Sequence, residues 1–426
     1  MSGVLVNDEG AVSRETLVSA TLIPAGRNPG QAAADAPRAS LLYNPRVRGF
    51  AYQAILAVVV GLILYEATTN AITNLQRAGI ARGFGFLNNT SGFDLNQTLI
   101  AYSSSTSTYF EAFLVGLINT LVVAAIGIVF ATMLGFVIGI ARLSNNWLIS
   151  KLATIYVEII RNLPLLLQLL FWYYAVLASL PQPRESARIG SWAFLNTRGL
   201  FVPKPLYDGR SWLVVAALAA GIVATIAVRI WAGREQARTG RQFPVGRTAL
   251  GLIIGLPLAA WAVLAVTGGS PITFDVPEQS RFNLRGGMQL FPEFVALLAG
   301  LIIYTAAFIA EVVRAGILSV SKGQTEAAHS LGLRPGATLR LVVVPQAMRV
   351  IVPPLTNQYL NLTKNSSLAV AIGYPDLVQV FMGTVLNQTG QAVEVVVITM
   401  AVYLTISLLT SSAMNLYNRR MAIVER

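Results

Sequence analysis

The stretch that decides the fold is residues 321–345, SKGQTEAAHSLGLRPGATLRLVVVP. Ser321 and Gln324, three positions apart, are typical of a capping box that opens a helix. Good helix formers follow them, and Gly332 can supply the left-handed residue that ends the helix. Pro335 suits the first turn of a second short helix. The stretch therefore predicts a small helical hairpin, set between two apolar segments of the chain.

The side chains of this hairpin suit contact with another protein. Ala327 and Ala328 are small enough for a second surface to approach the backbone closely, and Glu326 places a charge beside them. Gly332 follows the glutamate by six positions. We therefore expect the hairpin to be a docking surface. The chain's one histidine, His329, lies within it and is expected on a solvated helix face, because a lone imidazole is a poor metal site.

The composition of the chain is that of a polytopic membrane protein. Apolar residues make up 54% of its 426 residues, and charged residues only 12%. Residues 112–141 carry no charge and exceed the roughly 20 apolar residues that a helix needs to cross the bilayer. The net charge of +12 lies largely at the ends of apolar segments, as orientation signals do, so nucleic-acid binding is not expected.

The apolar segments predict an all-α polytopic fold with about eight transmembrane helices. The expected spans cover residues 50–65, 112–141, 163–180, 212–228, 249–266, 294–310, 350–373 and 395–414. Basic residues before the first span and after the last predict that both termini are cytoplasmic. Residues 181–210 would then be external, although basic residues favour the cytoplasmic side. We keep this topology because the charges of the other loops support it. The basic residues of this loop are Arg184, Arg188, Arg198, Lys204 and Arg210.

The chain divides into regions by composition. Residues 1–49 are rich in Ala, Gly and Pro, which predicts a cytoplasmic tail of low order. The remaining regions are 50–108, a first helix and external loop; 109–180, with two expected spans; 181–293, with two more; 294–420, with the last three spans and the hairpin at 321–345; and 421–426, a C-terminal tail.

The seventh span is the candidate for the transport path. Its prolines and polar residues predict a discontinuous helix, and broken membrane helices commonly line transport pathways. Lys364 could hold a carboxylate, or it could extend to the interface as an anchor. Gln168 could join this path, although a helix-to-helix hydrogen bond is the simpler interpretation. The predicted pathway residues are Asn357, Asn361, Lys364, Asn365, Ser366 and Gln168.

Charged and small residues suggest two further features of the spans. Glu158 with Arg161, and Glu311 with Arg314, are three positions apart and can meet on one helix face near the cytoplasmic end. They predict either structural ion pairs or parts of an inner gate. The second span carries small residues at every fourth position, which favours close helix packing: Gly127, Ala131, Gly135 and Gly139.

Several chemistries are not expected of this chain. It has no cysteine and one histidine, so neither a catalytic cluster nor a metal site is predicted. No phosphate loop is present, because the segment 240–248 has the wrong spacing and lacks the required lysine. No cofactor is therefore expected on this chain.

Three motifs together resemble one family. They are the Glu-Ala-Ala pattern with its glycine, the sequence GLINTL at 116–121 and YVEIIRNLPLL at 156–166. The chain resembles the permeases of binding-protein-dependent ABC importers, in the branch for polar amino acids of the histidine, glutamate and glutamine permease type. Its long form is similar to the general L-amino-acid and glutamate/glutamine/aspartate/asparagine permeases of proteobacteria.

The resemblance implies a type I ABC importer core in the bacterial inner membrane, formed by residues 109–180 and 294–420, with residues 181–293 as an insertion that carries two extra helices. Glu326, Ala327, Ala328 and Gly332 would dock on a separate ATPase dimer, which binds ATP and Mg. A second, homologous permease and a periplasmic amino-acid-binding protein would complete the system. The alternative from another class is a self-sufficient ion-coupled amino-acid carrier, which should show an internal repeat and several deeply placed ionisable residues.

Overall fold

The computed structural model describes residues 45–77, 83–280 and 283–421. The chain divides into two compact units, residues 1–79 and 80–426. The expected cytoplasmic tail therefore lies outside the described residues for positions 1–44, as do positions 422–426 of the expected C-terminal tail.

The first unit consists, in its described part, of helix α1 (Pro45–Arg77). This helix is longer than the predicted span 50–65, because its polar second half keeps the helical hydrogen bonds. Thr68 and Thr73 donate their hydroxyls to the carbonyls four residues before, Leu64 and Thr69, at 2.7 and 2.8 Å. Hydroxyls satisfied in this way do not end a helix.

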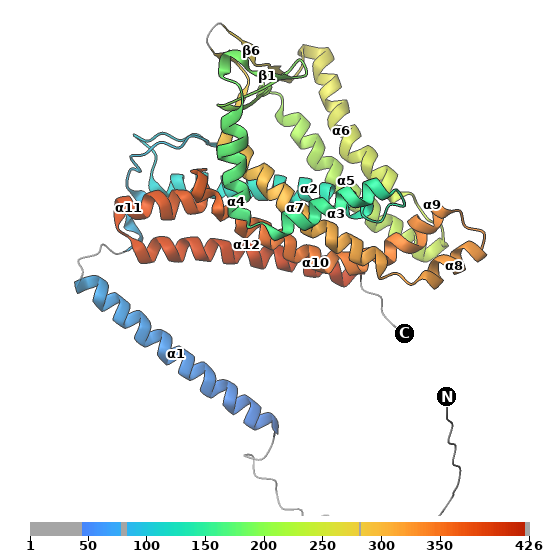
Figure 1. The fold of residues 1–426 in the computed structure, drawn as a ribbon, viewed down its shortest axis with the longest axis horizontal. Coiled ribbons are helices and arrows are strands. Elements are labelled where there is room, and N and C mark those ends of the chain that lie inside the picture. Colours follow the sequence, from blue (N-terminus) through green and yellow to red (C-terminus); the bar gives the residue numbers. More distant parts are fainter. Residues whose placement is uncertain (1–44, 78–82, 281–282, 422–426) are drawn as a thin grey trace, which may run out of the picture. The chain divides into compact units, whose positions relative to one another are not determined.

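The second unit is built from long apolar helices (Figure 1). With α1, the described chain has seven helices long and apolar enough to cross a membrane, or eight if a bent pair counts as one span. The prediction of about eight spans is confirmed. The helices of this unit are α2 (Tyr109–Ala141), α3 (Trp147–Asn162), α4 (Leu165–Leu170), α5 (Trp212–Thr239), α6 (Val245–Gly268), α7 (Pro292–Leu318), α8 (Lys322–Ser330), α9 (Pro335–Thr338), α10 (Val344–Asn365), α11 (Leu386–Thr389) and α12 (Ala392–Met421).

Helices α2 and α7 form the centre of this unit, and α10 packs against both. The small residues of α2 permit this contact, as the sequence predicts. A Cβ atom on Gly135 would lie 2.6 Å from the Cβ of Ile309, and one on Gly139 would lie 2.8 Å from the carbonyl oxygen of Ala310. Thr108 and Glu111 form a capping box at the start of α2.

The third span is a bent pair of helices. Helix α3 ends at Asn162, and α4 begins at Leu165 after a bend of 107°. Pro164 lacks an N–H group and restricts the residue before it to extended backbone, which explains the break. Beyond α4 the chain continues as the π-helix η3 (Phe171–Val176) and the short 3-10 turn η4 (Leu177–Ser179).

Helix α10 corrects the prediction of a broken seventh span. It runs without interruption from Val344 to Asn365, through Pro353 and Pro354. Both prolines fit helical φ, and the carbonyls that lose a partner belong to Arg349 and Val350, on an exposed face. Irregular turns flank the helix instead, namely the π-helix η6 (Leu339–Val343) and the 3-10 helix η7 (Ser366–Ile372).

A further helical segment follows η7 and was not predicted. The chain turns at residues 373–376 and continues as the π-helix η8 (Gln379–Val385) and α11 before α12 begins. Before α2, the 3-10 helix η2 (Phe84–Asn88) packs its Phe86 near Tyr109, with ring centroids 6.0 Å apart.

The described residues of the insertion form eight short strands that the sequence analysis did not predict, because runs of two to four residues are too short for a clear alternation. They follow the 3-10 turn η5 (Pro183–Glu185). They form a sheet in the order β1-β2-β3-β8 and two pairs, β4-β5 and β6-β7. The strands are β1 (Ala187–Ile189), β2 (Ala193–Asn196), β3 (Gly199–Val202), β4 (Lys204–Tyr207), β5 (Ile272–Asp275), β6 (Glu278–Gln279), β7 (Leu284–Arg285) and β8 (Met288–Leu290).

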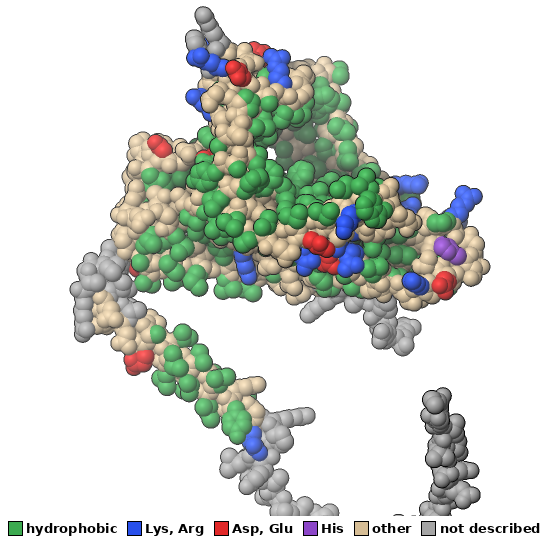
Figure 2. Space-filling model, in the orientation of Figure 1, with side chains coloured by type: hydrophobic (Ala, Val, Ile, Leu, Met, Phe, Trp, Pro, Cys, Tyr) green, Lys and Arg blue, Asp and Glu red, His purple; other side chains and the backbone are tan. Residues whose placement is uncertain are grey.

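Strand pairing fixes the relation between two loops of the topology. β3 pairs with β8 and β4 with β5, so the loops before α5 and after α6 must lie on the same side of the membrane. This agrees with the predicted order of crossings, in spite of the basic residues in 181–210. Helices α5 and α6 pack closely on each other at Gly221 and make few contacts with the other helices. Figure 2 shows the apolar side chains that cover the helices.

Candidate functional site

The predicted hairpin is present, and its cap is a Schellman motif. Gly332 takes a φ of 75° after α8, its N–H donates to the carbonyl of His329, and the N–H of Leu333 donates to that of Ala328. Pro335 opens α9 as expected. The expected capping box at Ser321 is absent, because the Ser321 side chain makes no capping bond and Gln324 instead meets Gln346.

Three of the four predicted contact residues of the hairpin are exposed, and one is buried. Glu326, Ala327 and Gly332 are exposed, but Ala328 is buried and packs inside the hairpin. Ala328 therefore helps to form the hairpin and does not offer a surface to a partner. Leu331 is 82% exposed at the tip, a feature that the sequence analysis missed. Figure 2 shows the histidine, His329, at this exposed end of the unit.

The carboxylate of Glu311 forms ion pairs with three guanidinium groups where α3 and α7 meet the end of α2. Glu311 pairs with Arg142, with Arg314 at 2.8 Å and with Arg161 at 3.5 Å. The predicted pair of Glu311 and Arg314 is confirmed. The expected pair of Glu158 with Arg161 is wrong, because Arg161 turns to α7, where its guanidinium lies 5.3 Å from the ring centroid of Phe308.

The polar residues of the seventh span fall on two faces of the helix. Asn357, Asn361 and Lys364 are exposed along one face of α10, as their spacing requires. Asn365 is half-buried. Ser366 is buried and donates its hydroxyl to the carbonyl of Thr363 at 2.7 Å, so it does not join the exposed face.

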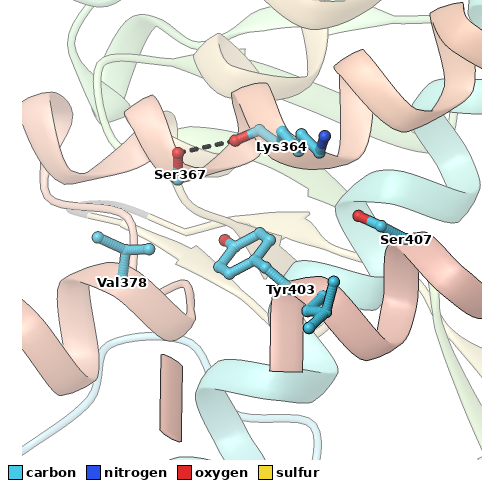
Figure 3. A pocket seen from close by; sticks show the side chains of 6 residues that line it. Lys364, Ser367, Val378, Tyr403 and Ser407 are labelled. Carbon is cyan, nitrogen blue, oxygen red and sulfur yellow. Dashed lines mark hydrogen bonds between the residues drawn. The ribbon is translucent and has the colours of Figure 1, made fainter. Parts of the chain in front are cut away.

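Lys364 lies at the edge of a pocket of about 320 Å³ (Figure 3). Ser367 from η7 and Tyr403 and Ser407 from α12 line it with Lys364, so one cation and three hydroxyls surround this space. The hydroxyls of Ser367 and Tyr403 donate to the carbonyl of Lys364 and to Asp376, so Lys364 and Ser407 are the donors that remain for a carboxylate or an amide. Val378 supplies part of the apolar wall.

Gln168 lies apart from this pocket, at the bend between α3 and α4. Its side-chain nitrogen donates to the carbonyls of Ile160 and Leu163, at 2.9 and 3.0 Å. The amide thus satisfies the last turn of α3, in agreement with the interpretation as a helix-to-helix hydrogen bond. It also lines an apolar pocket of about 360 Å³ with Leu167 and Trp172.

Comparison with known proteins identifies the family. Residues 230–423 match the profile described as binding-protein-dependent transport system inner membrane component. The general L-amino acid transport system permease protein of Rhizobium johnstonii is 53% identical over 388 residues, which cover 91% of this chain and 95% of that protein. The chain belongs to the binding-protein-dependent ABC transporter permeases.

Two other relatives of the permease match over a similar length. A putative amino-acid ABC transporter permease protein of Escherichia coli is 52% identical over 384 residues, 90% of this chain and 96% of that protein. The glutamate/glutamine/aspartate/asparagine transport system permease protein of Rhodobacter capsulatus is 41% identical over 430 residues, which cover 92% of this chain and 99% of that protein. The permease is thus a transport subunit and a multi-pass inner-membrane protein, and the ion-coupled carrier is not supported.

The permease also has a buried polar cluster that the sequence analysis missed. Asn119 of α2 donates to the carbonyls of Gln97 and Pro375, both at 2.9 Å, and Thr120 accepts from the N–H of Leu377 at 3.0 Å. These bonds hold the turn after η7 against α2. The signal was present in the motif GLINTL, whose Asn and Thr are polar residues in an apolar span.

Asp376 is the centre of this cluster. It is fully buried, accepts from the N–H of Gln379 at 2.8 Å and from the hydroxyl of Tyr403 at 3.3 Å, and lies in the turn outside the spanning helices. Burial raises the pKa of its carboxyl to about 7, although hydrogen bonds from Gln379, Val378 and Tyr403 oppose the shift. The described residues contain no group of acidic or histidine side chains able to hold a metal ion.

Proposed function

We propose that this permease takes up L-amino acids, polar, acidic or of broad range, that a periplasmic binding protein delivers. The names of its relatives support this substrate class. The subunit would pair with a second, homologous permease, and an ATPase dimer on the cytoplasmic side would bind ATP and Mg. Both termini would be cytoplasmic, which is consistent with the basic residues that flank the spans.

The observation that carries the proposal is the exposed hairpin of α8 and α9. A nine-residue helix with its own cap, projecting at the end of α7, is a rigid element that a partner can push or pull. Glu326, Ala327 and Gly332 would meet the ATPase surface, and Leu331 would fill an apolar recess in it. Ala328 would hold the hairpin together.

Coupling would run from the hairpin into the spans. Helix α7 joins α8 through only three residues and carries Glu311 about two turns from its end. Motion of the hairpin would therefore reach the ion pairs that join α7 to Arg142 of α2 and Arg161 of α3. These pairs would act as an inner gate, alternating between two states that ATP and substrate bind differently.

The exposed polar face of α10 is the best candidate for the path of the amino acid. Asn357, Asn361 and Lys364 form a polar stripe on a membrane helix, and such a stripe is costly against lipid. We infer that it faces a water-filled path beside the second permease. Lys364, with Tyr403 and Ser407 beside it, would meet the carboxylate of the substrate. The other possibility is that Lys364 is only an anchor.

Uptake in proteoliposomes with internal ATP and external binding protein tests the proposal. Gly332→Asp should abolish uptake while the complex still assembles, because only glycine adopts the positive φ of this cap without strain. Gly336→Asp is the matched control, since Gly336 is also exposed in the hairpin but has no positive φ. Uptake by this chain alone, driven by an ion gradient, would refute the proposal.

Lys364→Ala tests the path in the same assay. A changed preference among acidic, amide and neutral amino acids is the expected result, because the substrate would lose its cation. Lys151→Ala, which removes an exposed lysine of α3 that does not line the pocket, serves as the control. Transport with unchanged preference would leave Lys364 an anchor.

A further inference from the structure

The strands of the insertion form one interlocked body, which we call the β head (the described residues 183–207, 272–280 and 283–290). Its two stretches are separated in sequence by the α5–α6 hairpin. They are joined by the pairing of β3 with β8 and of β4 with β5. Because strands of one stretch are hydrogen-bonded to strands of the other, the two stretches cannot move independently. The β head is therefore a preformed surface.

The interior of the β head supports this rigidity. Phe194, Phe201 and Leu284 form its small core. Asn196 is fully buried and donates to the hydroxyl of Ser186 at 2.9 Å, so its amide is not left unpaired.

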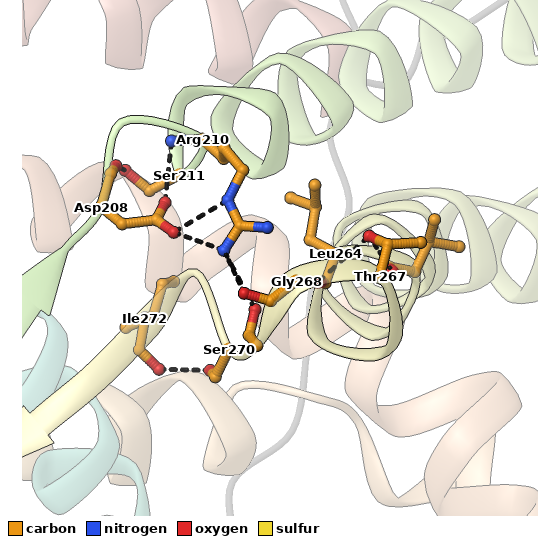
Figure 4. Close-up of polar contacts among 10 residues, drawn as sticks. Asp208, Arg210, Ser211, Leu264, Thr267, Gly268, Ser270 and Ile272 are labelled. Carbon is orange, nitrogen blue, oxygen red and sulfur yellow. Dashed lines mark hydrogen bonds and ion pairs between the residues drawn. The ribbon is translucent and has the colours of Figure 1, made fainter.

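Polar contacts also close the base of the β head where α5 begins and α6 ends (Figure 4). Arg210 pairs with Asp208 at 2.7 Å and donates to the carbonyl of Gly268 at 2.8 Å. Ser270 donates to the carbonyl of Ile272. The base is therefore tied to both helices of the insertion.

The β head and the coupling hairpin lie at opposite ends of α7. Strand β8 ends at Leu290 and α7 begins at Pro292, while α8 begins shortly after the last residue of α7, Leu318 (Figure 1). A helix of 27 residues is about 40 Å long, enough to cross the bilayer. If the hairpin meets the cytoplasmic ATPase, the β head is external.

The exposed side chains of the β head are those that recur at protein interfaces. Trp192 and Tyr207 are 51% and 68% exposed, and Phe274 is 62% exposed. Aromatic residues and arginine are enriched at binding hot spots, where exposed rings supply apolar area with a polar edge. An external surface with exposed rings of this kind indicates a protein partner.

Charge points to the chemistry of that partner. Lys204 and Arg285 lie opposite Asp275 and Glu278 in the strand registers, so these charges offset one another. The four-stranded sheet has two further cations, Arg188 in β1 and Arg198 in the turn between β2 and β3, with no acidic residue opposite them in the strand registers.

Arg188 and Arg198 form no ion pair with the described residues. The Arg188 guanidinium lies 5.5 Å from the ring centroid of Phe194, which holds it in place. Trp192 lies in the turn before β2 and Arg198 in the turn after it, so the β head carries an apolar ring and two unpaired cations along this edge, which fit an acidic partner surface with an apolar patch.

We propose that the β head is the docking surface for the external binding protein, which would present an acidic face to Arg188, Arg198 and Trp192. The inference rests on the proposed function for the existence and side of that partner. The family depends on a binding protein, and the insertion is matched in relatives that cover about nine-tenths of this chain. Docking here would hold the loaded binding protein above α7.

The test uses the complete transporter in nanodiscs with its purified binding protein. The double variant Arg188→Glu/Arg198→Glu should raise the concentration of binding protein that gives half-maximal ATPase stimulation by tenfold or more, and should weaken its salt dependence. Basal ATPase activity should stay unchanged. Arg234→Glu/Arg238→Glu, an equal charge change at the far end of α5, is the control and should leave the half-maximal concentration unchanged.

Trp192→Ala provides a second variant without a change of charge, and should also raise the half-maximal concentration. An unchanged value for both variants would overturn the proposal. So would loss of the second permease from the complex, which would make the β head a subunit interface.

Direct binding of the binding protein to the nanodiscs separates this inference from the proposed function. Gly332→Asp should block uptake and leave binding intact. A wild-type complex that binds the protein through Arg188 and Arg198 but transports no amino acid would refute only the proposed function.

Discussion

Glu311 makes more ion pairs than any other acidic residue that the structure describes. It pairs with Arg142, Arg161 and Arg314. Replacing it with glutamine leaves the guanidiniums of Arg142, Arg161 and Arg314 to repel one another. We expect a loss of about 2 kcal/mol, modest because the carboxylate and two of the arginines remain partly exposed. The apparent Tm of the purified complex should fall by several degrees.

Glu158→Gln is the control for that measurement, since Glu158 is exposed on α3 and takes part in no ion pair among the described residues. A Glu311→Gln variant as stable as this control would show that the network contributes nothing. Loss of coupling without loss of stability would assign Glu311 to the gate alone.

Asp376 predicts a pH dependence of stability. Its carboxyl has a pKa of about 7 in the folded protein, against 3.8 ordinarily, so the folded state holds a proton that the unfolded chain has released. The stabilisation is complete below pH 3.8 and is lost as the pH rises to about 7. Apparent Tm should therefore fall between pH 5 and 7.5, and Asp376→Asn should flatten this fall, because asparagine does not titrate.

The control for this titration is Asn145→Ala, which removes an exposed amide that does not titrate, so its pH slope should stay as in the wild type. Equal slopes for Asp376→Asn and wild type would contradict the expectation. Each unit of pKa shift corresponds to about 1.4 kcal/mol, so the difference is large enough to measure.

Single residues also show where sequence reasoning reached its limit. Gly332 could be placed as a helix cap because glycine at a left-handed position has one clear backbone reason. Ala328 and Ser366 were misplaced, because a small residue fits both an exposed and a buried face, and only packing decides between them. Asp376 was missed because nothing in the sequence indicates that a turn is buried against α2.

At the scale of elements, the contact of α2 with α7 depends on glycine. We expect Gly135→Ala to destabilise the permease by about 1–3 kcal/mol, because the added methyl group would meet the side chain of Ile309 and the carbonyl of Ala306 at 2.6 and 3.0 Å. Thermal unfolding of the purified complex measures the change.

Gly251→Ala in α6 is the matched control, because a Cβ there meets nothing within 4 Å. It should be neutral or slightly stabilising, since alanine is the better helix former. If the two variants shift Tm equally, close packing is not what Gly135 provides.

The two proline sites show why helix breaks were only partly predictable. Pro164 follows Leu163 in extended backbone and ends α3, whereas Pro353 and Pro354 lie inside an unbroken α10. At each site the proline lacks an N–H group and leaves the carbonyl four residues before it without its helical partner. What differs is that α10 exposes the carbonyls that lose their partners, so the helix keeps its course.

On the scale of the whole second unit, hydropathy predicted the helices and their order but not the β head. A long uncharged run such as 112–141 can only be a membrane-spanning helix. The number of such runs therefore predicts the number of spans. The strands depend on pairing between residues about 90 positions apart, as between Leu200 and Leu290. No local pattern contains that information, and the basic residues of 181–210 even argued against the side on which the loop was placed.

The same topology predicts that the α5–α6 hairpin is dispensable for the fold. Tyr207 and Ile272 are cross-strand neighbours at the ends of β4 and β5, so residues 208–271 could be replaced by an Asn-Gly turn that closes a tight hairpin. The deletion removes two crossings and keeps the side of every later segment. We expect a complex that assembles and transports amino acids, with β-head docking retained, as measured by size-exclusion chromatography and uptake. A deletion variant that assembles poorly, beside a wild type that assembles well, would show that α5 and α6 bind the second permease through the apolar faces that this subunit leaves exposed.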